Sequence, residues 1–110
     1  MGDDELAAYR RRIDEADEQL VSVLARRFRI THEIGVFKAA HGVPAVDLER
    51  QDQQIAKLRQ LAEQEGLDPD FCERFALFVM DEVVRNHVRI AESASKNIAA
   101  PAHPPADDPA

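Results

Sequence analysis

The 110-residue chain lacks most features that would indicate a secreted, metal-binding or membrane protein. Its single cysteine, Cys72, excludes a disulfide bond within the chain, and no spacing of cysteine and histidine resembles a zinc site. The sequence also lacks an N-terminal apolar run typical of a signal peptide and any apolar stretch long enough to span a bilayer. These absences predict a cytoplasmic protein that binds neither a metal nor a membrane.

Basic residues are outnumbered as well. The chain has 14 lysines and arginines against 21 aspartates and glutamates, which gives a formal net charge of -7. Nucleic-acid binding normally requires a basic surface, so this balance argues against nucleic acid as a partner. Cations on an inward face are therefore informative, because they are not part of a generally basic coat.

The segment from Leu6 to Lys38 has no proline and follows a helical period. One face of this helix would carry Arg10, Ile13, Asp17, Leu20, Leu24, Arg27, Thr31, Ile34 and Lys38. An unpaired charge that is buried costs on the order of several kcal/mol, so an ordinary inward face would be apolar throughout. Arg10, Arg27 and Lys38 on this face therefore indicate a buried anion.

The spacing of these cations also predicts a second copy of the chain. With a rise of about 1.5 Å per residue, Arg27 and Lys38 lie roughly 16 Å apart and can converge on one small molecule. Arg10 lies roughly 25 Å beyond Arg27, too far to reach the same molecule easily. In an antiparallel pair of helices, Arg10 of one chain would approach Arg27 and Lys38 of the other, giving two equivalent sites. Such a homodimer would also share the apolar surface that a small chain lacks alone.

Three helices account for most of the chain, and the predicted class is all-α. We expect helices over residues 4–40, 48–65 and 69–93. Gly42 and Gly66 would end the first two, whereas Asp47 and Asp68 would cap the next two. The apolar positions of the third helix, its phenylalanines included, are expected to be core. We therefore expect one helical domain over residues 1–93 and a flexible tail rich in alanine and proline over residues 94–110.

Taken in order, these motifs resemble a known family. The residues that carry the resemblance are Arg10-x-x-Ile13-Asp14-x-x-Asp17-x-x-Leu20-x-x-x-Leu24-x-x-Arg27, then Ile34-Gly35-x-x-Lys38, then Gly42-x-Pro44-x-x-Asp47-x-x-Arg50. Over residues 6 to about 92 the chain resembles the all-helical chorismate mutases. The resemblance implies an intertwined homodimer of three-helix chains in which each site borrows one arginine from the other chain.

The resemblance also implies a reaction and a set of roles. Chorismate, a dicarboxylate, would rearrange to prephenate in one concerted intramolecular step that needs no nucleophile and no cofactor. Arg27 and Arg10 of the second copy would bind the two carboxylates, where a guanidinium fork fits well. Lys38 would donate to the ether oxygen and a carboxylate. Arg50 would add positive charge, and Asp47 would offer its backbone N–H to the ring hydroxyl.

Three positions depart from the family pattern. Gln51 stands where a glutamate often binds the ring hydroxyl, and Val83 replaces a polar serine. His87 stands at the position that contacts the ether oxygen, where the family uses glutamine or a protonated glutamate. A protonated or suitably tautomeric imidazole could donate there, which makes His87 a candidate catalytic residue. The departures bear on rate, pH dependence and substrate choice more than on fold.

Simpler interpretations of the same residues stay open. The arginines could be solvated or paired with acidic residues of their own helix, Lys38 could be a helix-end cation, and Asp47 only a cap. His87 could be a satisfied core histidine. The same scaffold could also act on isochorismate, including pyruvate-lyase chemistry, or on amino-deoxychorismate. A different class is a non-catalytic helical dimer that regulates a partner enzyme of the shikimate pathway.

Overall fold

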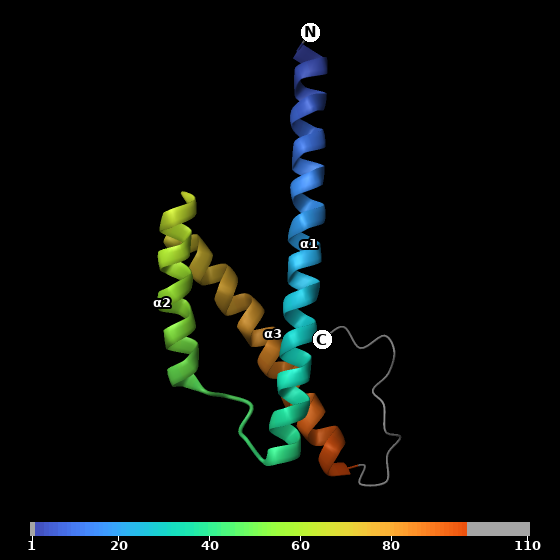
Figure 1. Ribbon diagram of the computed structural model, residues 1–110, viewed down its shortest axis with the longest axis vertical. Coiled ribbons are helices and arrows are strands. Elements are labelled where there is room, and N and C mark those ends of the chain that lie inside the picture. Colours follow the sequence, from blue (N-terminus) through green and yellow to red (C-terminus); the bar gives the residue numbers. More distant parts are fainter. Residues whose placement is uncertain (1, 97–110) are drawn as a thin grey trace.

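The computed structural model describes residues 2–96, and the elements in this part of the chain are three helices (Figure 1). They are α1 (Gly2–His41), α2 (Leu48–Glu65) and α3 (Pro69–Lys96). The predicted all-α class is confirmed. α3 continues three residues past its expected end, because no proline or glycine follows closely enough to stop it. The rest of the predicted tail, residues 97–110, lies outside the described residues, so the domain boundary stays a prediction.

The two connections between the helices lie where the local sequence predicts. Gly42 adopts a φ of 66°, and the Val43 amide donates to the Lys38 carbonyl at 2.9 Å, which closes α1. Gly66 adopts a φ of 73° and ends α2 in the same left-handed conformation. Asp68 then caps α3, since its Oδ1 accepts from the Asp70 amide at 2.9 Å. These turns fix the directions in which the three helices leave the two connections.

α3 holds the molecule together. It packs against both α1 and α2, whereas α1 and α2 make no direct backbone contact within residues 2–96. At the contact between α2 and α3, Arg59 pairs with Asp70 and Glu73 at 3.0 Å each. The hydrogen bond to Asp70 raises the pKa of the Arg59 guanidinium above its ordinary value. The first and second helices are therefore positioned relative to one another through the third.

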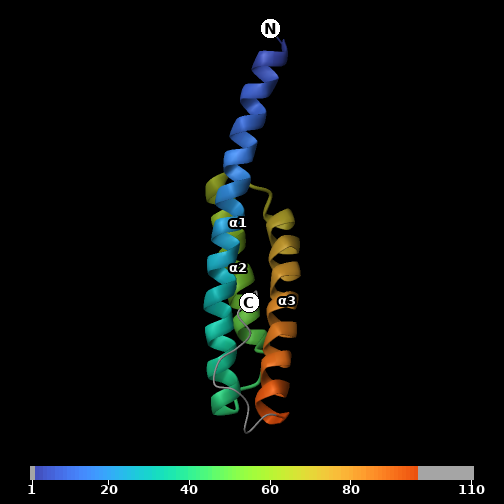
Figure 2. The ribbon, with the colours of Figure 1, turned by 90° about the vertical axis from the view of Figure 1, so that its right-hand side faces the viewer.

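The N-terminal half of α1 projects beyond the other two helices (Figure 2). Every residue from 9 to 23 is exposed, on all faces of the helix. The exposed side chains include large apolar residues of the stripe predicted to face inward, among them Ile13 and Leu20. Within the single chain, this part of the predicted inward face is exposed.

The core of the single chain is small. Its buried apolar residues are Ala62, Ala76, Val79 and Met80. The expectation that the phenylalanines of α3 belong to this core is wrong for the single chain, since Phe71, Phe75 and Phe78 are all exposed. The residues of α3 that are buried between the helices lie on other faces, which leaves a large part of each ring uncovered within the chain. None of the helices in residues 2–96 is both long and apolar enough to cross a membrane.

Candidate active site

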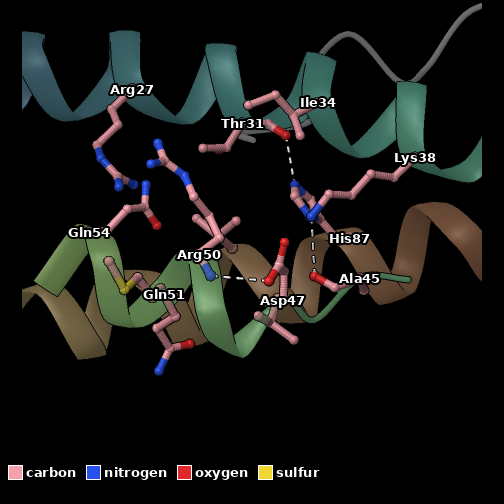
Figure 3. A pocket seen from close by; sticks show the side chains of 13 residues that line it. Arg27, Thr31, Ile34, Lys38, Ala45, Asp47, Arg50, Gln51, Gln54 and His87 are labelled. Atoms are coloured by element: carbon pink, nitrogen blue, oxygen red, sulfur yellow. Dashed lines mark hydrogen bonds between the residues drawn. The ribbon is translucent and has the colours of Figure 1, made fainter. Parts of the chain in front are cut away.

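A cavity of about 290 Å³ opens between α1 and α2, with α3 as its third wall (Figure 3). It is lined by Arg27, Thr31, Ile34, Lys38, Ala45, Asp47, Arg50, Gln51, Gln54, Met80, Val83, Val84 and His87. Seven of the eight residues that the sequence assigned to the site are in this set, and Arg10 is not. The cavity is of the size that a small organic ligand requires.

α1 supplies one wall through residues that recur at steps of three and four. Arg27, Thr31, Ile34 and Lys38 stand on one helical face and all line the cavity, as the periodicity predicted. The last of them, Lys38, lies one turn before the end of α1. Its Nζ donates to the Ala45 carbonyl at 3.5 Å, so the ammonium lies against the connection between α1 and α2. This long hydrogen bond leaves the ammonium able to donate elsewhere.

The first turns of α2 supply the opposite wall. Asp47 precedes the helix in an extended conformation, and its Oδ1 accepts from the Arg50 amide at 3.1 Å. This cap fixes the start of the helix, so that Arg50 and Gln51 line the cavity one turn later. Sequence reasoning missed Gln54, which lies on the same face. Its spacing of three and four residues from Gln51 and Arg50 was the available signal.

The charges of the cavity are unbalanced. Figure 3 shows the guanidinium groups of Arg27 and Arg50 extending into the same space from α1 and α2. Within residues 2–96, neither they nor Lys38 form an ion pair with a carboxylate. The only carboxylate among the lining residues is Asp47, whose Oδ1 already accepts from the backbone. Three cations that converge without compensation favour an anion with more than one negative charge.

α3 contributes an apolar wall and one histidine. Met80, Val83 and Val84 line the cavity with hydrocarbon, while His87 is 5% exposed. His87 Nε2 lies 2.7 Å from the Thr31 carbonyl oxygen, and a carbonyl oxygen can only accept, so Nε2 carries a hydrogen and donates it. The buried Nδ1 atom has no hydrogen-bond partner in the described part of the chain.

Arg10 lies apart from the other predicted site residues. It is exposed on the projecting half of α1, roughly 25 Å along the helix from Arg27 by the helical rise. This is the separation that the spacing predicted. A role for Arg10 in the cavity would require the α1 helix of a second copy.

Comparison with known proteins identifies the family. Residues 9–88 match the family model of chorismate mutase type II. The chain belongs to the chorismate mutase type II family. This membership confirms the predicted family. The matched residues include every member of the cavity and Arg10.

Two curated relatives differ in name and length. The T-protein of Enterobacter agglomerans is 37% identical over 78 residues, which are 71% of this chain and 21% of that protein. The 4-amino-4-deoxychorismate mutase of Streptomyces pristinaespiralis is 30% identical over 100 residues, which are 91% of this chain and 78% of that protein. The chain thus spans about a fifth of the first relative and most of the second.

Proposed function

We propose that this chain is a chorismate mutase that converts chorismate to prephenate. The observation that carries this proposal is the set of three unpaired cations, Arg27, Lys38 and Arg50, around one cavity. Mere packing does not require such a set, and cations close together repel one another when no anion is bound. A substrate with two carboxylates supplies the missing charge. Family membership supports the same reaction.

The reaction suits a site that contains no activated nucleophile. One carbon–oxygen bond of the ether breaks while one carbon–carbon bond forms within the same molecule, so no proton or electron leaves the substrate. Catalysis then requires a compact conformer and donors placed where negative charge develops. Arg27 and Arg50 would hold the carboxylates, and the apolar wall around Val83 would press the substrate into its reactive shape. Lys38 would donate to the ether oxygen as the bond lengthens.

The active form in this proposal is a homodimer with shared sites. The exposed residues 9–23 of α1 include apolar side chains on the predicted inward face, and a second, antiparallel α1 would cover them. The same arrangement would carry Arg10 of one chain to the cavity of the other. Each cavity would then hold four cations, Arg10 included, for one dicarboxylate. The position of Arg10 supports this assignment, because its guanidinium is too far along α1 to bind an anion in the cavity of its own chain.

A second candidate substrate is 4-amino-4-deoxychorismate. The relative named for a mutase of this compound matches 91% of the chain. An amino group would replace the ring hydroxyl, while both carboxylates and the ether would remain. The Arg27, Arg50 and Lys38 contacts would therefore be the same for both substrates. Discrimination would depend on groups near the ring, where Asp47 and Gln51 line the cavity.

The proposed setting is the shikimate route to aromatic amino acids in the cytoplasm, with a partner enzyme of that route as a further binding candidate. The test is direct. Purified chain is incubated separately with chorismate, isochorismate and 4-amino-4-deoxychorismate, and the products are identified by chromatography and mass spectrometry. We expect the chain to form prephenate from chorismate with the highest kcat/KM of the three substrates. The R27Q variant serves as the control and should be inactive. Release of pyruvate, or a preference for the amino compound, would replace the proposed substrate.

A further inference from the structure

We propose that His87 is a positioning residue. Its hydrogen bond to the Thr31 carbonyl holds the α3 wall of the cavity against α1, and the imidazole ring can reach this carbonyl because it packs against Gly35. The sequence assigned His87 to the reacting ether oxygen instead. The kinetic part of this inference rests on the proposed function, whereas its structural part does not. Two contacts and their location carry it: the hydrogen bond, the close approach at Gly35, and the presence of Thr31 and His87 among the residues that line the cavity.

The hydrogen bond commits one nitrogen of the ring. Nε2 donates to the Thr31 carbonyl at 2.7 Å, a short and direct contact between residues 56 positions apart in the chain. The same carbonyl is the helical acceptor for the amide of Gly35, four residues on. His87 therefore adds a second donor to a carbonyl of the α1 backbone. While this bond lasts, the Nε2 hydrogen is not available to a ligand.

Gly35 makes the approach of the imidazole possible. It is the buried residue of α1, and a Cβ built on it would lie 2.6 Å from His87 Cδ2 and 3.1 Å from Nε2. Real Cβ atoms essentially never approach another atom as closely as 2.6 Å, and 3.1 Å is tighter than most Cβ contacts, so any larger residue at position 35 would force the ring away from Thr31. A Cβ would also lie 2.9 Å from Ile90 Cδ1, but that atom ends a flexible side chain and can rotate aside. The backbone at Gly35 is helical, so any residue could adopt its conformation. Glycine is required here only because a side chain would collide with the imidazole.

This contact lies where a small displacement would change the site. Thr31 and Lys38, on either side of Gly35 along α1, both line the cavity, and so does His87. Val83 stands one turn before His87 on α3 and forms part of the apolar wall. If the ring withdrew from Thr31, α3 would shift relative to α1, and the wall would move away from the cations. The expected consequence is weaker substrate binding and a less compact bound conformer.

The other nitrogen does not favour the role of ether donor. Nδ1 is buried, and nothing in the described residues hydrogen-bonds to it. With the hydrogen on Nε2, Nδ1 of a neutral ring can only accept, and the ether oxygen also can only accept. His87 can therefore donate to the ether only by abandoning Thr31 or by carrying a second proton. Lys38 needs neither change.

The structural part is tested by a double-mutant cycle in thermal unfolding. We expect G35A to lower the unfolding midpoint by roughly 5 °C or more, since overpacking strains both helices. In the H87A background the same change should cost much less, because the added Cβ meets no ring. If G35A does not fold while the double variant does, the coupling is equally established. Equal effects of G35A in both backgrounds, or failure of both to fold, would overturn the proposal.

The kinetic part compares H87Q with H87N. The amide nitrogen of glutamine reaches the place of Nε2 and can still donate to Thr31, whereas that of asparagine falls short. We expect H87Q to keep KM within about threefold, and H87N and G35A to raise KM roughly tenfold with a smaller loss in kcat. G35A is decisive, because it adds no group that could reach the substrate. A donor role would instead lower kcat in both H87N and G35A at unchanged KM.

A third measurement requires no turnover. The nitrogen NMR spectrum of the His87 imidazole should show a protonated Nε2 that is unchanged when prephenate is added. A change of the protonated nitrogen on binding would overturn the positioning role. If the chain turned over none of the three substrates, the proposed function would fail, and the unfolding cycle and this spectrum would still decide the inference.

Discussion

Lys38 at the end of α1 donates to the carbonyl oxygen of Ala45, across 3.5 Å, and thereby links the helix to the connection that leads into α2. The contact is long for a hydrogen bond, so little is lost when the ammonium turns to a ligand. Both residues line the cavity. Lys38 is thus held at the cavity without a carboxylate that would compete for its charge.

Removal of the Lys38 ammonium is expected to lower turnover strongly. K38M keeps much of the side-chain stem, but we expect kcat to fall about 10²–10³-fold, the loss that follows removal of one preorganised donor. Steady-state kinetics on folded protein measures it. K57M is the matched control, because Lys57 is exposed on α2 and does not line the cavity. Near-normal turnover of K38M would reduce Lys38 to a helix-end cation.

Shared sites predict complementation between inactive variants. R10A and K38A should each be inactive alone, whereas a mixture after subunit exchange should recover roughly a quarter of the wild-type activity, because half of the dimers are mixed and each has one complete site. Activity is followed over time after mixing. The control is the neighbouring variant R11A, which takes the place of R10A in the mixture and should be active without a second variant. Mixed dimers that are demonstrated by mass spectrometry and yet inactive would contradict the cross-chain model.

Arg27 should govern substrate affinity. R27K keeps the charge but loses the planar fork, and we expect KM to rise roughly tenfold because two parallel hydrogen bonds to a carboxylate become one. The neighbouring R26K, exposed and outside the cavity, controls for general effects on the helix. Equal KM values for the two variants would show that Arg27 does not bind a carboxylate in bidentate fashion.

The exposed half of α1 predicts where dimerisation can be broken. L20D would place a charge on the face expected to contact the second copy, and it should yield inactive monomers in sedimentation experiments. S22D, on the opposite side of the same turn, should stay dimeric. Both residues are exposed in the single chain, so neither change disturbs its own core. A dimeric L20D would mean that this face is not an interface.

The sequence predicted what depends on neighbours along the chain. Periodicity placed Arg27 and Lys38 on one face, and cap residues such as Asp47 located the ends of the helices, because both effects act within a few residues. Gln54 was within reach of the same reasoning, one turn beyond Arg50, although the family pattern quoted above ends at Arg50.

The contacts between distant segments could not be obtained in this way. The hydrogen bond from His87 to Thr31 depends on how α3 crosses α1, and no local pattern encodes that crossing. The periodicity of α3 showed which of its faces were apolar, but not which of them the chain itself would cover. Phe78 was therefore assigned to the core, although it is exposed in the single chain. An apolar face is expected to be shielded from water, but its sequence does not show whether the same chain or a second copy shields it.

Within the described part of the chain the backbones of α1 and α2 contact α3 but not each other, which has an electrostatic consequence. Arg27 and Arg50 repel each other across the empty cavity, and within residues 2–96 no backbone contact between their two helices opposes this force. Added salt screens such repulsion, so moderate ionic strength should raise the melting temperature of the empty protein. A bound dicarboxylate would replace that screening by an attraction on both sides. The bound substrate would therefore stabilise α1 and α2 relative to one another. The same salt that raises the melting temperature of the empty protein would weaken substrate binding.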